Sequence, residues 1–241
     1  RLLQYHPDYA FVAFPPGYNN YPIGLASVGN RIWAAVSYFD CDPDSGLYVA
    51  DSVFILDTNG VRHGAFTIPD RPNVNALAEG DGVVWALYNN RNSIGTIDPA
   101  AGVVRHQFAL HGRFGSPQGI VWALDRLWIT GLFPDSIYGI RTDLSIDSGF
   151  AVVDWSIEFP WDCADGSGLL AWDGTHFYVL DGPCLERVDL TGASVEHHIF
   201  PFADSWPQGR QACHIAWDGT TMWAFHRDSP RPYALSRIRL P

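Results

Sequence analysis

Short apolar runs alternate with polar turns along the whole chain, and the runs recur in the same order. Five of the runs carry an aromatic residue near their middle, at intervals of 43 to 52 residues. These aromatic residues are Trp33, Trp85, Trp128, Tyr178 and Trp223. Self-similarity at a period of 20–50 residues is typical of repeat architectures. The pattern therefore predicts five copies of one structural unit.

Each copy has room for four short strands. A small or apolar triplet precedes each aromatic run, and these triplets read GLA, ALA, GIV, LLA and HIA. An apolar ladder follows each run, as in SVFILD and SIGTID, and a fourth run such as GAFTIP comes after it. Asp-Gly pairs, as in AWDGT, supply the positive φ of tight turns between strands. We call the four expected strands a, b, c and d in chain order.

The last copy lacks a d strand, because the chain ends soon after YALSRIRLP. Residues 9–15 read as a d strand that leads into the first a strand. The sequence therefore predicts an all-β, five-bladed β-propeller of four-stranded blades, in which the N-terminal strand completes the C-terminal blade. The expected blades of this single domain, residues 1–241, are 16–69, 70–111, 112–160, 161–201 and 202–241 with 1–15. A six-bladed propeller with one degenerate blade, or a β-sandwich, fits the even period less well.

The composition limits the classes of binding partner and the compartment that we expect. The net charge of −11 argues against a nucleic-acid partner. No apolar run has the length of a membrane span, so we expect no membrane insertion. The four cysteines form an even set that favours an oxidising compartment, and the sole methionine is Met222, which indicates a lost leader or a trimmed chain. We therefore expect an exported, extracellular protein, and the sequence leaves the oligomeric state open.

Two families share the repeat pattern. The units SIGTIDPAAGVVRHQFAL and SPQGIVWALDRLWITG resemble repeats of virginiamycin B lyase and related NHL-type propellers. Blade count, length and the runs QGIVWALDRLWI and LLAWDGTHFYVLD resemble plant-type glutaminyl cyclases. The resemblances imply lyase or cyclase chemistry on a small molecule. The catalytic motifs of both families are unmatched here, because Gln118 and Cys213 stand where the cyclases place an acidic residue.

Function is expected on one face. In a propeller the d–a and b–c connections share a face, and here they are long, aromatic and acidic, whereas the other connections are short turns. His214 occupies the first position of the last a strand, where earlier copies have Gly24, Ala76 and Gly119. We expect histidine acid–base chemistry of lyase, cyclase or hydrolase type at the axial mouth of this face. The expected catalytic residues are His214, His226, Asp181 and Tyr88.

Other side chains at this mouth are candidates for holding a small polar or aromatic ligand. Asn75 and Gln118 would position it. The remaining ligand-binding candidates are Tyr21, Phe114, Phe133, Trp161, Trp206 and Arg210. The aromatic rings also suit a lectin-like module that binds glycans, and a protein-interaction scaffold is a further alternative. Because the loops do not repeat from blade to blade, the sequence favours one asymmetric site.

Two more groups have a possible role. The segment DCDPDSG with a later aspartate resembles a calcium loop, and its possible Ca²⁺ or Mg²⁺ ligands are Asp40, Asp42, Asp44 and Asp51. The expected disulfides are Cys163–Cys184 and Cys41–Cys213, one of three pairings. Four other histidines fall in expected d strands, where we expect solvated outer edges. They are His63, His106, His197 and His198.

Overall fold

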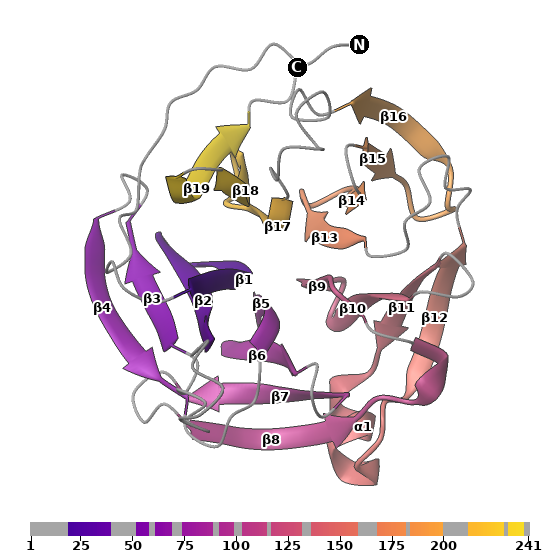
Figure 1. Cartoon of the computed structure of the whole chain (residues 1–241). Helices are drawn as coiled ribbons and strands as arrows, with labels where there is room; N and C mark the ends of the chain where they lie inside the picture. Colours follow the sequence, from indigo (N-terminus) through magenta and orange to yellow (C-terminus); the bar gives the residue numbers. More distant parts are fainter. Residues whose placement is uncertain are drawn as a thin grey trace.

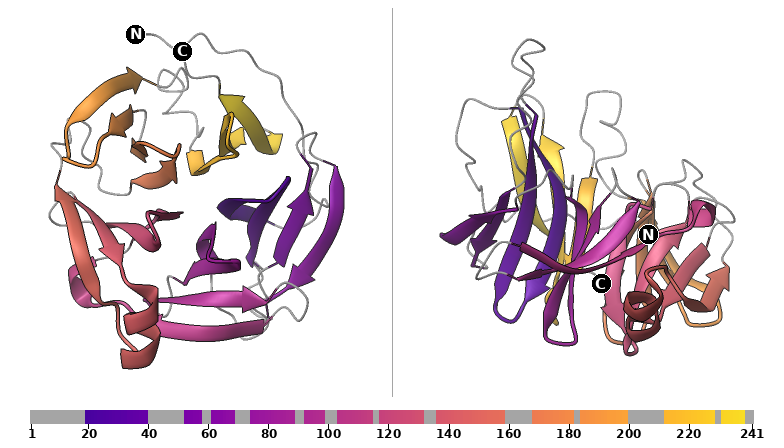
Figure 2. Two further views of the ribbon diagram at one scale, coloured as in Figure 1. Left: turned by 180° about the vertical axis from the view of Figure 1, so that it is seen from behind. Right: turned by 90° about the horizontal axis from the view of Figure 1, so that it is seen from below.

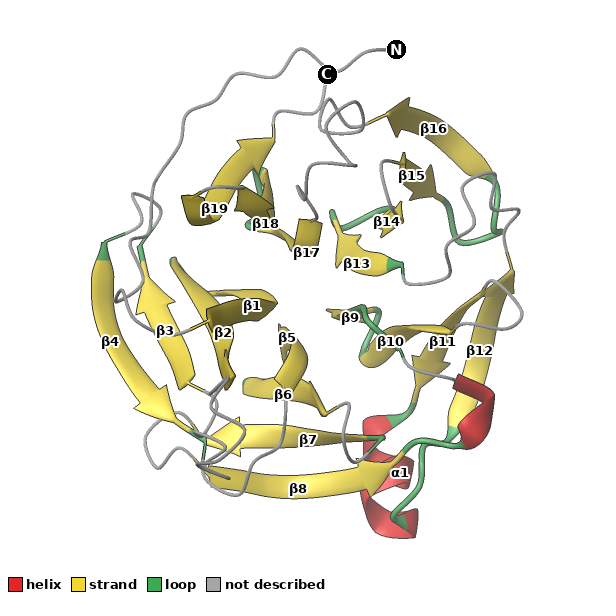
Figure 3. Ribbon diagram, in the orientation of Figure 1, coloured by secondary structure: helices red, strands yellow, loops and turns green. Residues whose placement is uncertain are grey.

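The computed structural model describes residues 19–39, 52–57, 61–68, 74–88, 92–98, 103–114, 117–131, 136–158, 168–181, 184–199, 212–228 and 231–238. Several predictions lie outside these residues: the strand at 9–15, the candidate metal ligands, Phe133, Trp161, Trp206, Arg210, Cys41 and Cys163. The class is all-β as predicted, with only one short α-helix and one 3-10 turn in the described part (Figure 3).

The strands form antiparallel sheets in chain order. The first sheet contains β1 (Asn19–Val28), β2 (Arg31–Phe39), β3 (Ser52–Leu56) and β4 (Arg62–Thr67). The second contains β5 (Val74–Gly80), β6 (Val83–Tyr88), β7 (Ser93–Asp98) and β8 (Val103–Ala109). The third contains β9 (Ile120–Ala123), β10 (Arg126–Gly131), β11 (Ser136–Ile140) and β12 (Val153–Glu158). The fourth contains β13 (Leu169–Trp172), β14 (Phe177–Asp181), β15 (Cys184–Val188) and β16 (Ser194–Ile199). The last has three strands among the described residues: β17 (Ala212–Trp217), β18 (Met222–Asp228) and β19 (Arg231–Ile238).

The sheets surround a central axis (Figure 1). The first strand of each sheet is innermost, and the innermost strands contact one another in a closed cycle, β1–β5–β9–β13–β17 and back to β1. The last strands of the four-stranded sheets lie at the periphery, as the view from behind also shows (Figure 2). The propeller-like arrangement of four-stranded sheets is therefore confirmed.

The core lies in the gaps between neighbouring sheets. Each of the five buried apolar clusters draws its residues mainly from two adjacent sheets. Each repeated aromatic residue fills one gap and is at most 6% exposed. We call these gaps seams. The aromatic repeat therefore arises from packing, because every seam needs one large ring on the b strand.

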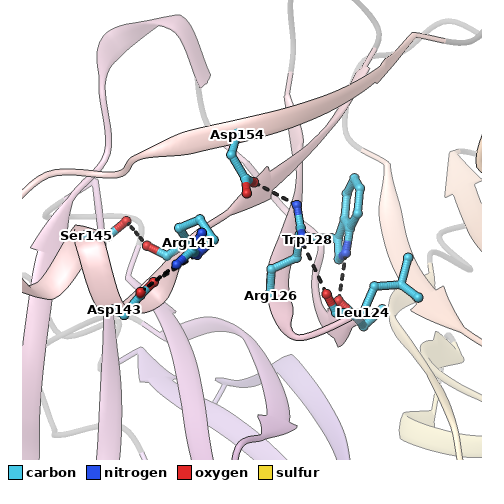
Figure 4. Close-up of polar contacts among 8 residues, drawn as sticks. Leu124, Arg126, Trp128, Arg141, Asp143, Ser145 and Asp154 are labelled. Carbon is cyan, nitrogen blue, oxygen red and sulfur yellow. Dashed lines mark hydrogen bonds and ion pairs between the residues drawn. The ribbon is translucent and has the colours of Figure 1, made fainter.

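The third sheet carries an insertion (Figure 4). Helix α1 (Thr142–Ser148) stands between β11 and β12, and the Ser145 hydroxyl donates to the Arg141 carbonyl at 2.6 Å. Arg126 joins β10 to β12 through Asp154 at 2.9 Å, and its Nε donates to the Leu124 carbonyl. The two contacts of Arg126 hold the turn between β9 and β10.

Among the described residues, the structure contains no helix with the length and apolar character of a membrane span.

Histidines on the outer strands are positioned as predicted. His63 on β4, His106 on β8 and His197 on β16 are exposed. The backbone of His198 also lies in β16. His63 contacts the Asp57 carboxylate at 2.9 Å, and His197 contacts the carboxylate of Glu186.

Candidate functional site

Two ends of the axis differ in their connections. The a–b turns, such as Asp173–Gly174 and Asp218–Gly219, lie at one end, which we call the turn side. The strand ends that lead into the d–a and b–c connections are at the other end, which we call the loop side. In β17 the chain runs from the loop side to the turn side, so Ala212 is nearer the loop side than Trp217.

His214 is buried near the start of β17. It is 1% exposed and pairs with Phe225 of β18. Its neighbours on β17 alternate between seams, because Ile215 packs against the fourth sheet and Ala216 against the first. The alternation of a strand places His214 on the side of Ala216, toward β1.

The imidazole of His214 has little polar compensation for its burial in the described part of the chain. Neither Nδ1 nor Nε2 has a hydrogen-bond partner there. Burial lowers the pKa of His214 to about 4, and the Ile215 backbone offsets only part of that effect. The side chain is therefore neutral near pH 7. An unsatisfied buried polar group costs about 1–3 kcal/mol, which calls for an explanation other than stability.

The crowding expected at this level of the axis is present. A Cβ on Gly119 would lie 2.7 Å from the Leu170 backbone nitrogen, and one on Gly24 would lie 3.1 Å from the Ala76 Cα. Small residues at these positions let the innermost strands approach. His214 and Leu169 are the larger members of this ring of positions, so the two seams beside the last sheet accommodate side chains that the Gly24, Ala76 and Gly119 positions lack.

In three sheets, the residue that precedes this ring of positions lies in a β-bulge and has no partner in the strand pairing. Register shifts lie between Pro22 and Gly24, between Val74 and Ala76, and between Ala212 and His214. The residues in these bulges are Ile23, Asn75 and Cys213. A bulge re-aims a side chain, and bulges are common beside active sites. The sequence pattern did not reveal them, because an added residue leaves the apolar spacing almost unchanged.

The structure brings two predicted ligand-binding residues together. Asn75 Nδ2 donates to Gln118 Oε1 at 3.1 Å, and both side chains are partly buried. Asn75 precedes Ala76 and Gln118 precedes Gly119, so this amide pair spans the second and third sheets on the loop side of the crowded ring.

Other predicted residues have different surroundings. Tyr88 is 1% exposed and its ring belongs to the seam between the first and second sheets. Phe114 is also fully buried, with 5.2 Å between its ring centroid and that of Tyr138. Its contact with a ligand stays a prediction.

For three predicted site residues only the backbone is described. His226 pairs with Ala212, so the expected proximity of the 213–214 and 225–226 segments is present at the backbone. Asp181 pairs with Cys184 at the loop-side end of the fourth sheet, and Tyr21 pairs with Ser37 in the first sheet. Their side chains lie outside the described part.

Cys184 takes part in a disulfide. It begins β15, and it is the one cysteine whose side chain the structure describes. Its pairing with Cys163, and that of Cys41 with Cys213, therefore stay predictions. Within the described residues no group of three or more His, Cys, Asp or Glu side chains could hold a metal ion. The possible calcium loop lies outside them.

A hollow of about 300 Å³ occupies the axis toward the turn side. Three consecutive residues from each of the five innermost strands line it, from the Leu25 level down to the Ser27 level. His214 and its equivalents do not line it, so the hollow lies on the turn-side flank of the crowded ring.

Comparisons with known proteins support the fold. The chain is similar in structure to the glutaminyl cyclase of Myxococcus xanthus, with a TM-score of 0.64, 12% sequence identity, and coverage of 94% of this chain and 93% of that chain. It also matches hydrazine synthase of Kuenenia stuttgartiensis at a TM-score of 0.44 and 15% identity, over 85% of this chain and 55% of that one, which is too distant to bear on the fold. No family model and no curated protein matches the sequence.

The ring of sheets and the structural likeness together define the class. The chain has a β-propeller fold. At 12% sequence identity, this structural similarity supports the fold alone. The activity has to be argued from the site.

Proposed function

We propose that this protein is an exported five-bladed propeller enzyme that binds a small polar molecule at the loop-side axial mouth and transforms it by acid–base chemistry at His214. The observation that carries the proposal is the buried, neutral imidazole without a hydrogen-bond partner among the described residues. An imidazole that is unprotonated near pH 7 can accept a proton, and a bound substrate would supply the hydrogen bond that no described residue supplies. The Asn75–Gln118 pair supports substrate positioning.

The five sheets of the described part support the blade count. The three-stranded last sheet leaves room for residues 9–15 as its fourth strand. The disulfide at Cys184 supports export, since disulfides persist mainly in oxidising compartments.

Cyclisation of an N-terminal glutamine is the first reaction to test, because the similar propeller is a glutaminyl cyclase. In that reaction the α-amino nitrogen attacks the side-chain carbonyl carbon, a carbon–nitrogen bond forms, and the amide nitrogen leaves as ammonia. His214 would take a proton from the attacking amine and return it to the leaving nitrogen. The bonds and protons of this reaction balance without a redox partner or a metal ion.

The experiment is a turnover assay with glutamine-initiated peptides, read by mass spectrometry as loss of ammonia, beside a thermal-shift screen of sugars and small natural products. His214→Leu is the informative variant, because Leu169 already occupies the equivalent position in the fourth sheet. His106→Leu on the exposed face of β8 is the matched control. We expect turnover or ligand binding to fall by about 10²–10⁴-fold in the His214 variant only. A folded His214→Leu protein with unchanged turnover and binding would refute the role of this residue.

A further inference from the structure

The axial hollow on the turn side has an uneven rim. The rim positions are the fourth residues of the innermost strands, counted from the crowded ring. They are Ser27, Glu79, Trp122, Trp172 and Trp217. The hydroxyl and the carboxylate come from the adjacent first and second sheets, and the three indoles come from the other three. One flank of the rim is therefore polar and acidic, and the other is aromatic.

The indoles are held in place by stacking. Trp122 is parallel to Trp85 of the preceding sheet, with 6.2 Å between ring centroids, and Trp217 is parallel to Tyr178 at 6.4 Å. Trp172 packs on Phe177 at 4.6 Å. All three rim indoles are partly buried, so each keeps some exposed surface. A preformed aromatic surface loses little conformational freedom when a ligand binds.

Among the described residues, Glu79 is the one ionisable side chain that lines the hollow. It is exposed at the rim, and no described basic side chain shares the lining. The deeper lining residues, Leu25, Leu77, Ile120, Leu170 and Ile215, are at most 1% exposed because their side chains pack in the seams. The deeper wall is therefore mainly the backbone of the innermost strands. An anion would meet a carboxylate there without a counter-charge, whereas an organic cation would meet a carboxylate and indole rings. Aromatic rings attract cations electrostatically by about 0.5–2 kcal/mol each.

The inner edges of the lining strands add backbone acceptors. In the described sheets β1, β5, β9, β13 and β17 are each paired on one side only. Their other edges face the axis, and edge strands present unpaired carbonyl and N–H groups. The hollow of about 300 Å³ is at the lower end of the range for ligand pockets, so it suits a compact molecule.

We propose that this hollow is a second binding site, which takes a small organic cation: an ammonium group with a short apolar body. The ammonium lies between Glu79 and the indoles, and the short apolar part lies against the indole rings. This site is independent of His214, which does not line the hollow, and it involves no chemical step.

Calorimetric titration with three isosteric probes tests the proposal. Choline carries the charge, 3,3-dimethylbutan-1-ol is its neutral isostere, and 3,3-dimethylbutanoate is an anion of the same shape. We expect choline to bind at least about tenfold more tightly than the neutral isostere, equivalent to about 1.4 kcal/mol. Equal affinity of the two, preference for the anion, or no binding of choline would overturn the proposal.

Variants distinguish binding at Glu79 from a general effect of the protein's net charge. Glu79→Gln is nearly isosteric and should weaken choline binding by about tenfold or more. Asp147→Asn removes the same charge from the exposed face of α1 and should leave the affinity unchanged. Trp172→Leu should also weaken binding, and a thermal melt of each variant checks that it is folded. If Glu79→Gln and Asp147→Asn behave alike, the site is not at Glu79. His214→Leu should bind choline normally, so failure here and failure of the proposed enzyme are distinguishable.

Discussion

His214 links the pH dependence of stability to one buried side chain. Its pKa is about 4 in the folded protein against 6.5 for an unperturbed histidine. As the pH falls below 6.5, the unfolded chain takes up a proton that the folded chain refuses until about pH 4. Acidification from pH 6.5 to about pH 4 therefore lowers the free energy of unfolding by roughly 3 kcal/mol through this histidine. Above pH 6.5 the histidine has no such effect.

His214→Leu should flatten that dependence. Denaturant titrations at several pH values between 4 and 7 give the slope of the unfolding free energy, and the variant should lose less stability than the parent protein as the pH falls. His106→Leu, on an outer strand, should keep the parental slope. Parallel slopes for the parent and the His214 variant would mean that the imidazole is not desolvated.

Gly119 offers a test of the crowding around the axis. A methyl group there would lie 2.7 Å from both the Cβ and the backbone nitrogen of Leu170, and 2.8 Å from the Gly168 carbonyl oxygen. Because backbone atoms cannot move aside cheaply, Gly119→Ala should destabilise the fold by about 1–3 kcal/mol in denaturant unfolding. Gly112→Ala, where no atom lies within 4 Å, is the control and should be close to neutral. Equal stability of the two variants would show that the strands can separate without cost.

Turns between strands are built from repeated aspartates. Asp218 Oδ1 accepts hydrogen bonds from the N–H groups of Thr220 and Thr221 at 2.9 and 2.8 Å, and Oδ2 accepts from Trp223 Nε1 at 2.7 Å. Asp173 makes the same backbone contacts with Thr175 and His176 at 2.7 Å. Burial raises the pKa of Asp218, but the bonds from Trp223 and Thr220 outweigh it and leave that pKa below its usual value.

Asp218→Ala should therefore cost about 2 kcal/mol, because it frees two turn N–H groups and the indole N–H of a buried tryptophan. For a chain of this size the melting temperature should fall by roughly 4–8 °C. Asp147→Ala on the surface of α1 should change it little. A melting temperature unaffected by Asp218→Ala would indicate that water replaces these bonds.

The secondary-structure elements could be predicted from the sequence to different degrees. The Asp-Gly turns and the b-strand aromatics were predictable, since each depends on a local requirement: a positive φ, as at Gly174 and Gly219, or one large ring per seam. Helix α1 was not predicted, because its segment TDLSIDS lies where the other copies have a simple turn. The bulges before Ala76 and His214 leave no trace in apolar spacing, and only the paired backbone reveals them.

At the scale of the whole molecule, the order of the sheets followed from the repeat, whereas the chemistry of the axis did not. The equivalence of Ser27, Glu79 and Trp122 is visible once the copies are aligned. Their convergence on one rim depends on how five seams set the distance between inner strands, which no single copy encodes. The same holds for His214, whose position was predictable and whose complete burial was not.

Closure of the ring is the remaining test at this scale. The last sheet has three strands in the described part, and β19 pairs with β18 on one side only. The prediction that residues 9–15 supply the fourth strand means that deleting residues 1–15 removes a whole strand from one blade. A lost strand should lower the denaturant midpoint and expose the edge of β19, with a greater tendency to self-associate.

Deleting residues 1–8 is the matched control, since it stops before the predicted strand and should leave the midpoint nearly unchanged. A synthetic peptide of residues 1–15 added to the shortened protein should restore part of the lost stability in a concentration-dependent way, because it binds only the folded state. Two deletions with the same midpoint, or a peptide without effect, would place the N-terminal strand elsewhere. Partial rescue would show that the seam between the last and first sheets, where His214 is buried, depends on a strand from the opposite end of the chain.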